Sequence, residues 1–438
     1  MPSDLSQLGF LLFVSALVAM LTRRLRMPYT VGLVLAGMGL YFLRIHLQWH
    51  LSKELIFSVF LPPLVFEAAL FISWRELKKD LPVLSLLATV GVLLAAAVTA
   101  IGMHYALHWD WGSAMVFGVL IAATDPVSVI ATFKESGVRG RLRLLIEAES
   151  LLNDGTAAVA FVVALGFLAG AAPPDFLSIA GTLVLTIVGG ALIGAIVAFG
   201  FMLLAGGTRD YLVEITFTTL AAYGSFFVAE HFHLSGVLAA LTAGLVVGNF
   251  RSSALIIDTD RQALESFWKR LTFIANSLLL VMARAPRAQP ASRSATLLTD
   301  TGRQALEPFW EYVAFIANSL VFLLIGAQEA QQHFRGLWSP VVVAIVLVIL
   351  GRAVAIYPLC ALFLRSRLKV EFRHQHILFW GGLRGALALA LALAVPEELP
   401  QHDAIISITF AVVAFSIFAQ GLTIPLLLRK LGEMGRYP

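Results

Sequence analysis

The sequence predicts an all-α, polytopic membrane protein with about 13 transmembrane helices. Of its 438 residues, 59% are hydrophobic and 13% are charged, whereas about 25% of the residues in a typical soluble domain carry a charge. Apolar stretches of about 18 residues or more recur from one end to the other, and each can cross a hydrocarbon core about 30 Å thick as a helix. The pattern of a transmembrane barrel, strands of about 10 alternating residues, is absent.

Thirteen apolar segments are long enough to be spans, and the longest of them must tilt, break or extend beyond the lipid. In chain order they cover residues 5–22, 28–43, 52–72, 82–107, 112–133, 144–170, 176–205, 210–229, 234–249, 309–327, 338–364, 376–395 and 403–428.

The distribution of Lys and Arg predicts the orientation of these spans, because short cytoplasmic loops carry the excess of positive charge. With the N-terminus outside and the C-terminus in the cytoplasm, 26 of the 31 basic residues fall on the cytoplasmic side. The first segment has basic residues after it and none before it, the reverse of a signal peptide, so it is expected to be retained. Basic residues scattered between apolar segments do not make a nucleic-acid surface.

A tandem duplication interrupts the pattern. Residues 261–278 recur, with substitutions, at 303–320. If both copies crossed the membrane, the basic groups at 365–373 and 429–436 would face outside, against the charge count. We therefore expect a single transmembrane domain, 1–438, in which 251–302 is a cytoplasmic loop that contains the duplicated insert. The first copy is expected to lie at the interface or to be partly disordered. We interpret the duplication itself as one without function, because loops tolerate insertions.

The run A-A-T-D-P-V-S-V, residues 122–129, is the sharpest polar feature inside an apolar segment. Pro126 cannot donate a backbone hydrogen bond, and it disfavours helix at Asp125. A helix broken here releases main-chain carbonyls beside the Asp125 carboxylate and the Thr124 hydroxyl. Interrupted backbone at membrane depth is how transporters build ion sites, so we interpret this run as part of one.

A second polar run, E-A-E-S-L-L-N-D-G-T-A, covers residues 147–157. At helical spacing Ser150 and Asp154 lie four residues apart, as do Glu149 and Asn153, so their polar groups crowd one side of a helix. Hard monovalent cations take oxygen ligands, which these side chains supply. The sequence thus favours Asp154 and Asn153 as ion-binding residues, whereas Glu147 is nearer a basic loop and is expected at the interface.

Three further ionisable residues lie within predicted spans, where a charge is costly and marks a functional hypothesis. Glu67 is a lone acid that fits either a site or a position near the interface. Arg352 and Arg384 need counter-charges, and Glu149 is a natural partner for one of them. Glycines at 381, 382 and 385 permit a second interrupted helix beside Arg384, or simply close helix packing.

Other function classes find little support in the sequence. It contains no paired histidines with metal spacing, no nucleophile elbow and no phosphate-binding loop, so a membrane-embedded enzyme is not expected. His231 and His233 are interpreted as solvated loop residues, with a role in pH sensing as the alternative. A cation channel lined by the same acids stays open as an alternative to a carrier.

Taken together, T-D-P, E-S-L-L-N-D-G-T-A, F-I-A-N-S-L-V-F-L-L-I-G and G-G-L-R-G-A, in this order, resemble the sodium/proton antiporters of the NhaP and NHE branch. The resemblance covers nearly the whole chain except the inserted copy. It implies an inverted-repeat antiporter fold like that of NhaA, with broken crossing helices. It also implies a homodimer in a bacterial inner membrane that takes part in pH and sodium homeostasis, with no cofactor besides the transported Na⁺ and H⁺. K⁺/H⁺ exchange on the same fold is the alternative.

The resemblance also assigns roles to particular residues. Asp154 becomes the main carboxylate for the cation and the proton. Glu149 and Arg352 become a structural ion pair, and Arg384 stabilises the second crossing. Asn153, rather than a second aspartate, is typical of electroneutral members. The remaining residues that the resemblance implies for the cation site, directly or through water, are Asp125, Thr124, Ser150 and Glu67.

Overall fold

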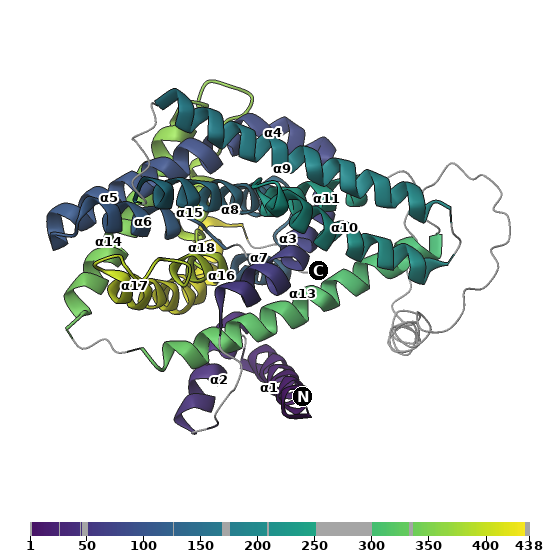
Figure 1. Cartoon of the computed structure of the whole chain (residues 1–438), viewed down its shortest axis with the longest axis horizontal. Helices are drawn as coiled ribbons and strands as arrows, with labels where there is room; N and C mark the ends of the chain where they lie inside the picture. Colours follow the sequence, from purple (N-terminus) through teal and green to yellow (C-terminus); the bar gives the residue numbers. More distant parts are fainter. Residues whose placement is uncertain are drawn as a thin grey trace. The chain divides into compact units, whose positions relative to one another are not determined.

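A computed structural model describes the chain over residues 2–25, 27–43, 45, 51–125, 127–168, 176–207, 210–250, 300–332 and 336–433. All the regular structure in these ranges is helical (Figure 1). Eight of the helical stretches are long and apolar enough to cross a membrane, and four shorter apolar helices accompany them. The prediction of an all-α membrane protein is confirmed.

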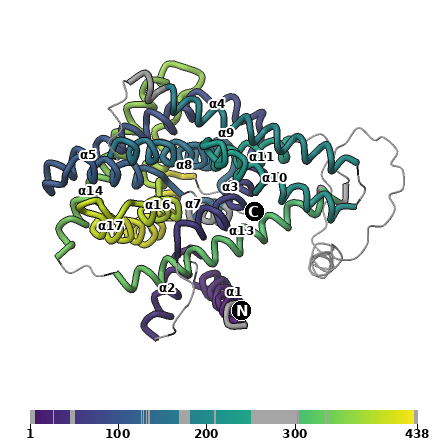
Figure 2. The backbone as a smooth tube through the Cα atoms, viewed as in Figure 1, coloured from purple at the N-terminus to yellow at the C-terminus, as the bar shows by residue number. Residues whose placement is uncertain are grey.

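Every predicted span coincides with helical structure, and two spans are interrupted where the sequence predicts or permits a break. Their order can be followed by colour in Figure 2. The helical elements outside the second unit defined below are α1 (Pro2–Leu25), α2 (Tyr29–Phe42), η1 (Leu55–Phe60), α4 (Trp74–Leu86), η2 (Leu87–Gly91), α5 (Val92–Leu107), α6 (Trp111–Leu120), α7 (Val127–Ser136), α8 (Arg141–Leu168), α14 (Trp338–Ala361), α15 (Phe372–Trp380), α16 (Ala386–Ala392), α17 (His402–Phe415), η3 (Ser416–Gly421) and α18 (Leu422–Leu431).

The chain forms two compact units. The first comprises Met1–Leu61, Trp74–Val188 and Ile316–Pro438, and the second comprises Pro62–Ser73 and Gly189–Phe315. The first unit contains both interrupted helices. Within it α5 packs against α6 and α14, and α6 packs against α8 (Figure 1). Helix α8 is buried along most of its length, which places its polar run inside the unit.

Close approach of two backbones fixes α2 against the last turns of α13 (Asp300–Glu329). A Cβ atom at Gly37 would lie 2.0 Å from the carbonyl oxygen of Leu323, so only glycine fits. About two turns nearer the start of α2, the hydroxyl of Tyr29 is 2.7 Å from that of Ser319. Small residues that let helices approach, together with hydrogen bonds between them, stabilise helix pairs in lipid.

The second unit is built from α3 (Leu61–Leu70) and parts of α9 (Phe176–Ala205) and α13, with α10 (Tyr211–His231) and α11 (Gly236–Phe250). Its core surrounds Trp310, whose ring is 4.5 Å from that of Phe66, centroid to centroid. The Trp310 indole also donates to the Thr218 hydroxyl at 3.2 Å, which satisfies the ring N–H that burial removes from water.

Wide π-helical turns precede the prolines of two helices. Elements η1 and η3 each end within a few residues of a proline, Pro62 and Pro63 after η1 and Pro425 after η3. A proline has no N–H to bond the carbonyl four residues earlier, and its ring crowds that carbonyl. A local π adjustment accommodates both effects.

The duplicated segment divides between described and undescribed residues. The second copy, 303–320, lies within α13, which begins at Asp300, earlier than the predicted start of that span. The first copy, 261–278, and the insert around it lie outside the described residues, so their expected cytoplasmic location stays a prediction.

Candidate cation site

The two interrupted helices of the first unit meet at their breaks. Helix α6 ends at Leu120 and α7 begins at Val127, while α15 ends at Trp380 and α16 begins at Ala386. The backbone N–H of Asp125 donates to the carbonyl of Leu383 at 2.7 Å. A main-chain bond of this kind between two unwound stretches satisfies groups that the helices no longer pair.

Asp125 caps both half-helices that start at this crossing. Its carboxylate accepts from the backbone N–H of Val127 at 2.9 Å and from that of Ala386. A negative charge is stabilised at a helix N-terminus by the free N–H groups and the helix dipole. The carboxylate lies directly against Gly385, where a Cβ atom would come within 2.0 Å of Oδ2. The glycine is therefore required by this close approach.

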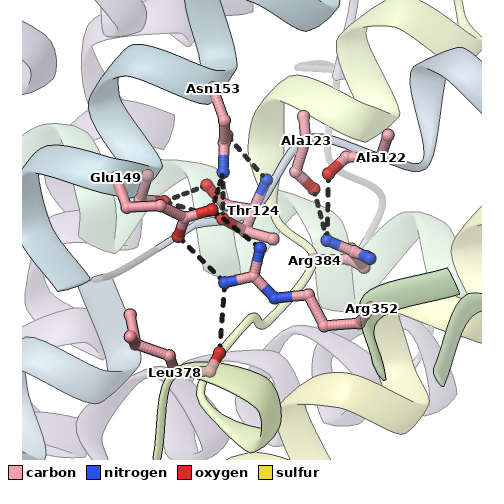
Figure 3. Close-up of polar contacts among 9 residues, drawn as sticks. Ala122, Ala123, Thr124, Glu149, Asn153, Arg352, Leu378 and Arg384 are labelled. Carbon is pink, nitrogen blue, oxygen red and sulfur yellow. Dashed lines mark hydrogen bonds and ion pairs between the residues drawn. The ribbon is translucent and has the colours of Figure 1, made fainter. Parts of the chain in front are cut away.

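Arg384 supplies the opposite charge to the same crossing. Its guanidinium donates to the carbonyls of Ala122 and Ala123, both at 3.1 Å (Figure 3). These carbonyls follow the last turn of α6, where a cation is favoured by the helix dipole. The Ser416 hydroxyl holds the Arg384 backbone, accepting from its N–H at 3.0 Å and donating to its carbonyl at 3.1 Å.

Thr124 is held by side chains of α8. Its backbone N–H donates to Asn153 Oδ1 at 3.1 Å, and the Asn153 amide donates to its hydroxyl at 2.6 Å. The Ser150 hydroxyl lies 3.1 Å from that of Thr124 and donates to the Thr124 carbonyl. Figure 3 shows Asn153 pointing from its helix toward Thr124. The broken helix and the polar run of α8 therefore form one hydrogen-bonded cluster.

Glu149 and Arg352 form a buried, bidentate ion pair. The two guanidinium nitrogens donate to the two carboxylate oxygens at 2.7 and 2.9 Å, and the residues are 2% and 7% exposed. Arg352 also donates to the Leu378 carbonyl at 3.1 Å, and Glu149 accepts from the Asn153 amide at 3.2 Å (Figure 3). The pair thus links α8 and α14 to the end of α15.

Asp154 differs from its neighbours because, among the described residues, its side chain has no hydrogen-bond or ion-pair partner. It lies on α8 and is 8% exposed. Asp125 and Glu149 are close enough for their charges to act on it electrostatically. A buried carboxylate without a partner is costly, so this position favours a neutralised state, with either a proton or a cation on the carboxyl group.

The predicted acids at positions 67 and 147 lie on α3 and α8, respectively. Glu67 belongs to α3 of the second unit and is partly exposed, so its place in the site stays a prediction. Glu147 forms an ion pair with Arg143 at 2.8 Å, one helical turn away. Arg143 is about a third exposed, in agreement with the interfacial interpretation of Glu147.

Sequence reasoning missed the groups that support the site through the main chain. Ser416 lies in an apolar segment with no polar pattern around it, and Leu378 contributes only a carbonyl oxygen. The wide helical turn η3, in which Ser416 lies, has no sequence motif. The proline that follows this turn is the one feature that could have marked it.

The chain is similar in sequence to known proteins. The family model described as "Sodium/hydrogen exchanger, transmembrane" matches residues 10–283 and 289–430. The chain is 36% identical to the Na⁺/H⁺ antiporter ApNhaP of Aphanothece halophytica, over 94% of this chain and 71% of the relative. It is 30% identical to the Na⁺/H⁺ antiporter NhaP of Pseudomonas aeruginosa, over 95% of both.

The fold is similar to that of the sodium proton antiporter MjNhaP1 from Methanocaldococcus jannaschii. The TM-score is 0.71 at 18% identity, over 100% of this chain and 99% of that structure. The predicted antiporter fold is therefore confirmed. Together with the family match over most of its length, this likeness shows that the chain belongs to the sodium/hydrogen exchanger family.

Proposed function

We propose that the chain exchanges one Na⁺ for one H⁺ across the membrane by alternating access at Asp154. The observation that carries this proposal is the Asp154 carboxyl, buried beside an unwound, hydrogen-bonded crossing and without a partner among the described residues. A cation and a proton compete for the same negative charge, so the carboxyl holds one or the other. Because either occupant neutralises it, the loaded site can change sides at low cost.

The groups around Asp154 suit a hard monovalent cation. Carboxylate, hydroxyl and carbonyl oxygens are the ligands such ions take, and Thr124, Ser150 and Asp125 present them beside α8. Asn153 and Glu149 are engaged in the hydrogen bonds that hold this cluster, so we assign Asn153 to positioning Thr124 as well as to the cation-binding set. Glu67 stays in the proposed set through the family resemblance.

One-for-one stoichiometry follows from the neutral amide at position 153. If Asp154 is the only group that carries its occupant across the membrane, one cation replaces one proton and no net charge moves. A second acid in place of Asn153 would release a further proton. Electroneutral exchange should therefore continue when the membrane voltage is clamped.

The test is cation-driven proton movement in proteoliposomes that contain a pH-sensitive dye. Sodium, potassium and lithium gradients are compared for the unaltered protein, Asp154→Asn and the matched control Asp403→Asn. Asp403 is an exposed aspartate at the start of α17, so its substitution removes the same charge away from the site.

Exchange driven by sodium, abolished in Asp154→Asn, retained in Asp403→Asn and independent of voltage would support the proposal. A response to potassium instead of sodium would favour K⁺/H⁺ exchange. Uncoupled current would favour a channel. Transport that survives in Asp154→Asn would refute the assignment of the site.

We also propose a homodimer in a bacterial inner membrane, with the N-terminus outside, the C-terminus in the cytoplasm and a role in pH and sodium homeostasis. The orientation is supported because it puts 26 of the 31 basic residues on the cytoplasmic side, where short loops carry the excess of positive charge. Labelling of single cysteines added to the loops at 108–110 and 366–369 tests it, since only the first should react from outside. The mass of the protein in lipid nanodiscs tests the dimer.

A further inference from the structure

Another buried carboxyl group lies at the end of α13, which is not one of the two interrupted helices. Glu329 is the last residue of this helix and is 5% exposed. One of its carboxylate oxygens, Oε2, is buried without a hydrogen-bond partner among the described residues. Glu329 takes part in none of the ion pairs found between described residues.

Such a group is unusual even in a membrane protein. Removing a bare carboxylate from water is costly, and buried charges are normally paired or hydrogen-bonded. Each of the other acids of the first unit discussed above, apart from Asp154, has a partner: Glu149 has Arg352, Asp125 caps two helices and Glu147 has Arg143. Glu329 therefore shares with Asp154 the property that no described side chain neutralises its carboxylate, so a proton or a cation would stabilise it.

Two residues close to Glu329 in the chain carry further amide oxygen acceptors. Gln328 Oε1 is buried without a partner among the described residues. Gln332, three residues beyond Glu329, accepts from the Ser407 hydroxyl at 3.0 Å and so fastens this end of α13 to α17 (Figure 1). Amide and carboxyl oxygens that lack donors are acceptor groups suited to a hard cation or a proton.

We propose that Glu329 is a second site for the transported proton and cation, at the end of α13 that the charge distribution places outside. It would hold a proton until an external cation displaces it, and so load the cation onto the carrier from that side. This inference rests on the proposed exchange activity. It adds a residue that lies on a different helix from Asp154 and outside the motifs of the crossing.

Transport kinetics in proteoliposomes test the role of Glu329, with pH and sodium varied on each side separately. Glu329→Gln preserves the shape of the protonated acid but cannot ionise. The matched control is Glu397→Gln, which neutralises an exposed acid in the loop before α17. If the unaltered protein shows no exchange, the proposed function is refuted. A failure of the second site would instead appear only in the comparison of Glu329→Gln with the unaltered protein.

For Glu329→Gln we expect the external sodium concentration at half-maximal rate to rise about tenfold, the loss of one contact to a charged group. The maximal rate should be unchanged, and half-saturation should depend less on external pH. Glu397→Gln should stay within about twofold. Kinetics of Glu329→Gln equal to those of the unaltered protein, or an equal change in Glu397→Gln, would overturn the proposal.

Chemical labelling provides a readout that does not depend on transport. A hydrophobic carbodiimide reacts with protonated carboxyl groups in apolar surroundings, and peptide mapping by mass spectrometry separates Glu329 from Asp154. We expect Glu329 in the unaltered protein to be labelled and added sodium to slow the labelling. Absence of labelling, or labelling insensitive to sodium, would refute the site even if Glu329→Gln failed to fold.

Discussion

Replacing Arg352 with methionine would remove one partner of the most buried ion pair described in the chain. Glu149 would keep its charge while 2% exposed, and its remaining described hydrogen bond would be the one from the Asn153 amide at 3.2 Å. Breaking a buried pair from one side typically costs about 3–5 kcal/mol, because it leaves an uncompensated charge. We expect Arg352→Met to destabilise the fold by this amount.

The double variant Arg352→Met, Glu149→Leu separates the buried charge from the lost packing. Replacing both partners of a buried pair by apolar residues is often nearly neutral. Here the Asn153 amide would lose one acceptor, at a cost of about 1 kcal/mol. The double variant should therefore be more stable than Arg352→Met alone, although it carries one more substitution.

Thermal unfolding of the purified protein in lipid nanodiscs measures these differences. The control is Arg373→Met, which breaks contacts with Glu371, about half exposed, and with Glu433 at 3.0 Å. Because the Arg373 side chain is itself about half exposed, this control should lower the midpoint temperature by much less than Arg352→Met. Arg352→Met should lower the midpoint by several degrees. Equal midpoints for Arg352→Met and Arg373→Met, or a double variant less stable than Arg352→Met, would refute the reasoning.

Two further predictions concern the crossing and the exposed pair of Arg373 with Glu371. Gly385→Ala should abolish exchange in folded protein because its Cβ would displace the Asp125 carboxylate, whereas Gly39→Ala, with nothing within 4 Å, should retain it; equal activity of the two variants would contradict the assigned contact. Arg373 lowers the pKa of exposed Glu371, so this pair stabilises the fold at neutral pH and loses its contribution as pH falls through the lowered pKa. The acid-side fall in unfolding midpoint should therefore be smaller in Arg373→Gln, and an unchanged or steeper fall would argue against the pair.

The helices could be predicted from the sequence because lipid demands long apolar segments. Each predicted span contains helical structure, and the break between Leu120 and Val127 lies where Asp125 and Pro126 indicated it. Boundaries were less exact, since α13 starts at Asp300 rather than near 309. An amphipathic helical extension beyond the lipid does not alter hydropathy within the span.

The partners of the site residues required the fold. Local spacing placed Ser150, Asn153 and Asp154 on one helix, but it could not show that Asn153 is occupied with Thr124 while Asp154 has no partner in the described chain. Both are buried polar residues adjacent in the sequence. Their difference arises from the direction in which each side chain leaves the helix and from what packs there.

The sequence by itself determined that the chain is a bundle of membrane-spanning helices with two polar interruptions, because burial in lipid makes each polar residue conspicuous. Only the tertiary structure decided that Asp125 caps two half-helices and that Arg384 donates hydrogen bonds to carbonyls of the other interrupted segment. It also decided that Glu329 has no ion-pair partner among the described residues. Pairing depends on distances between segments far apart in the chain. Those distances are set by packing of whole helices, which no local pattern of residues encodes.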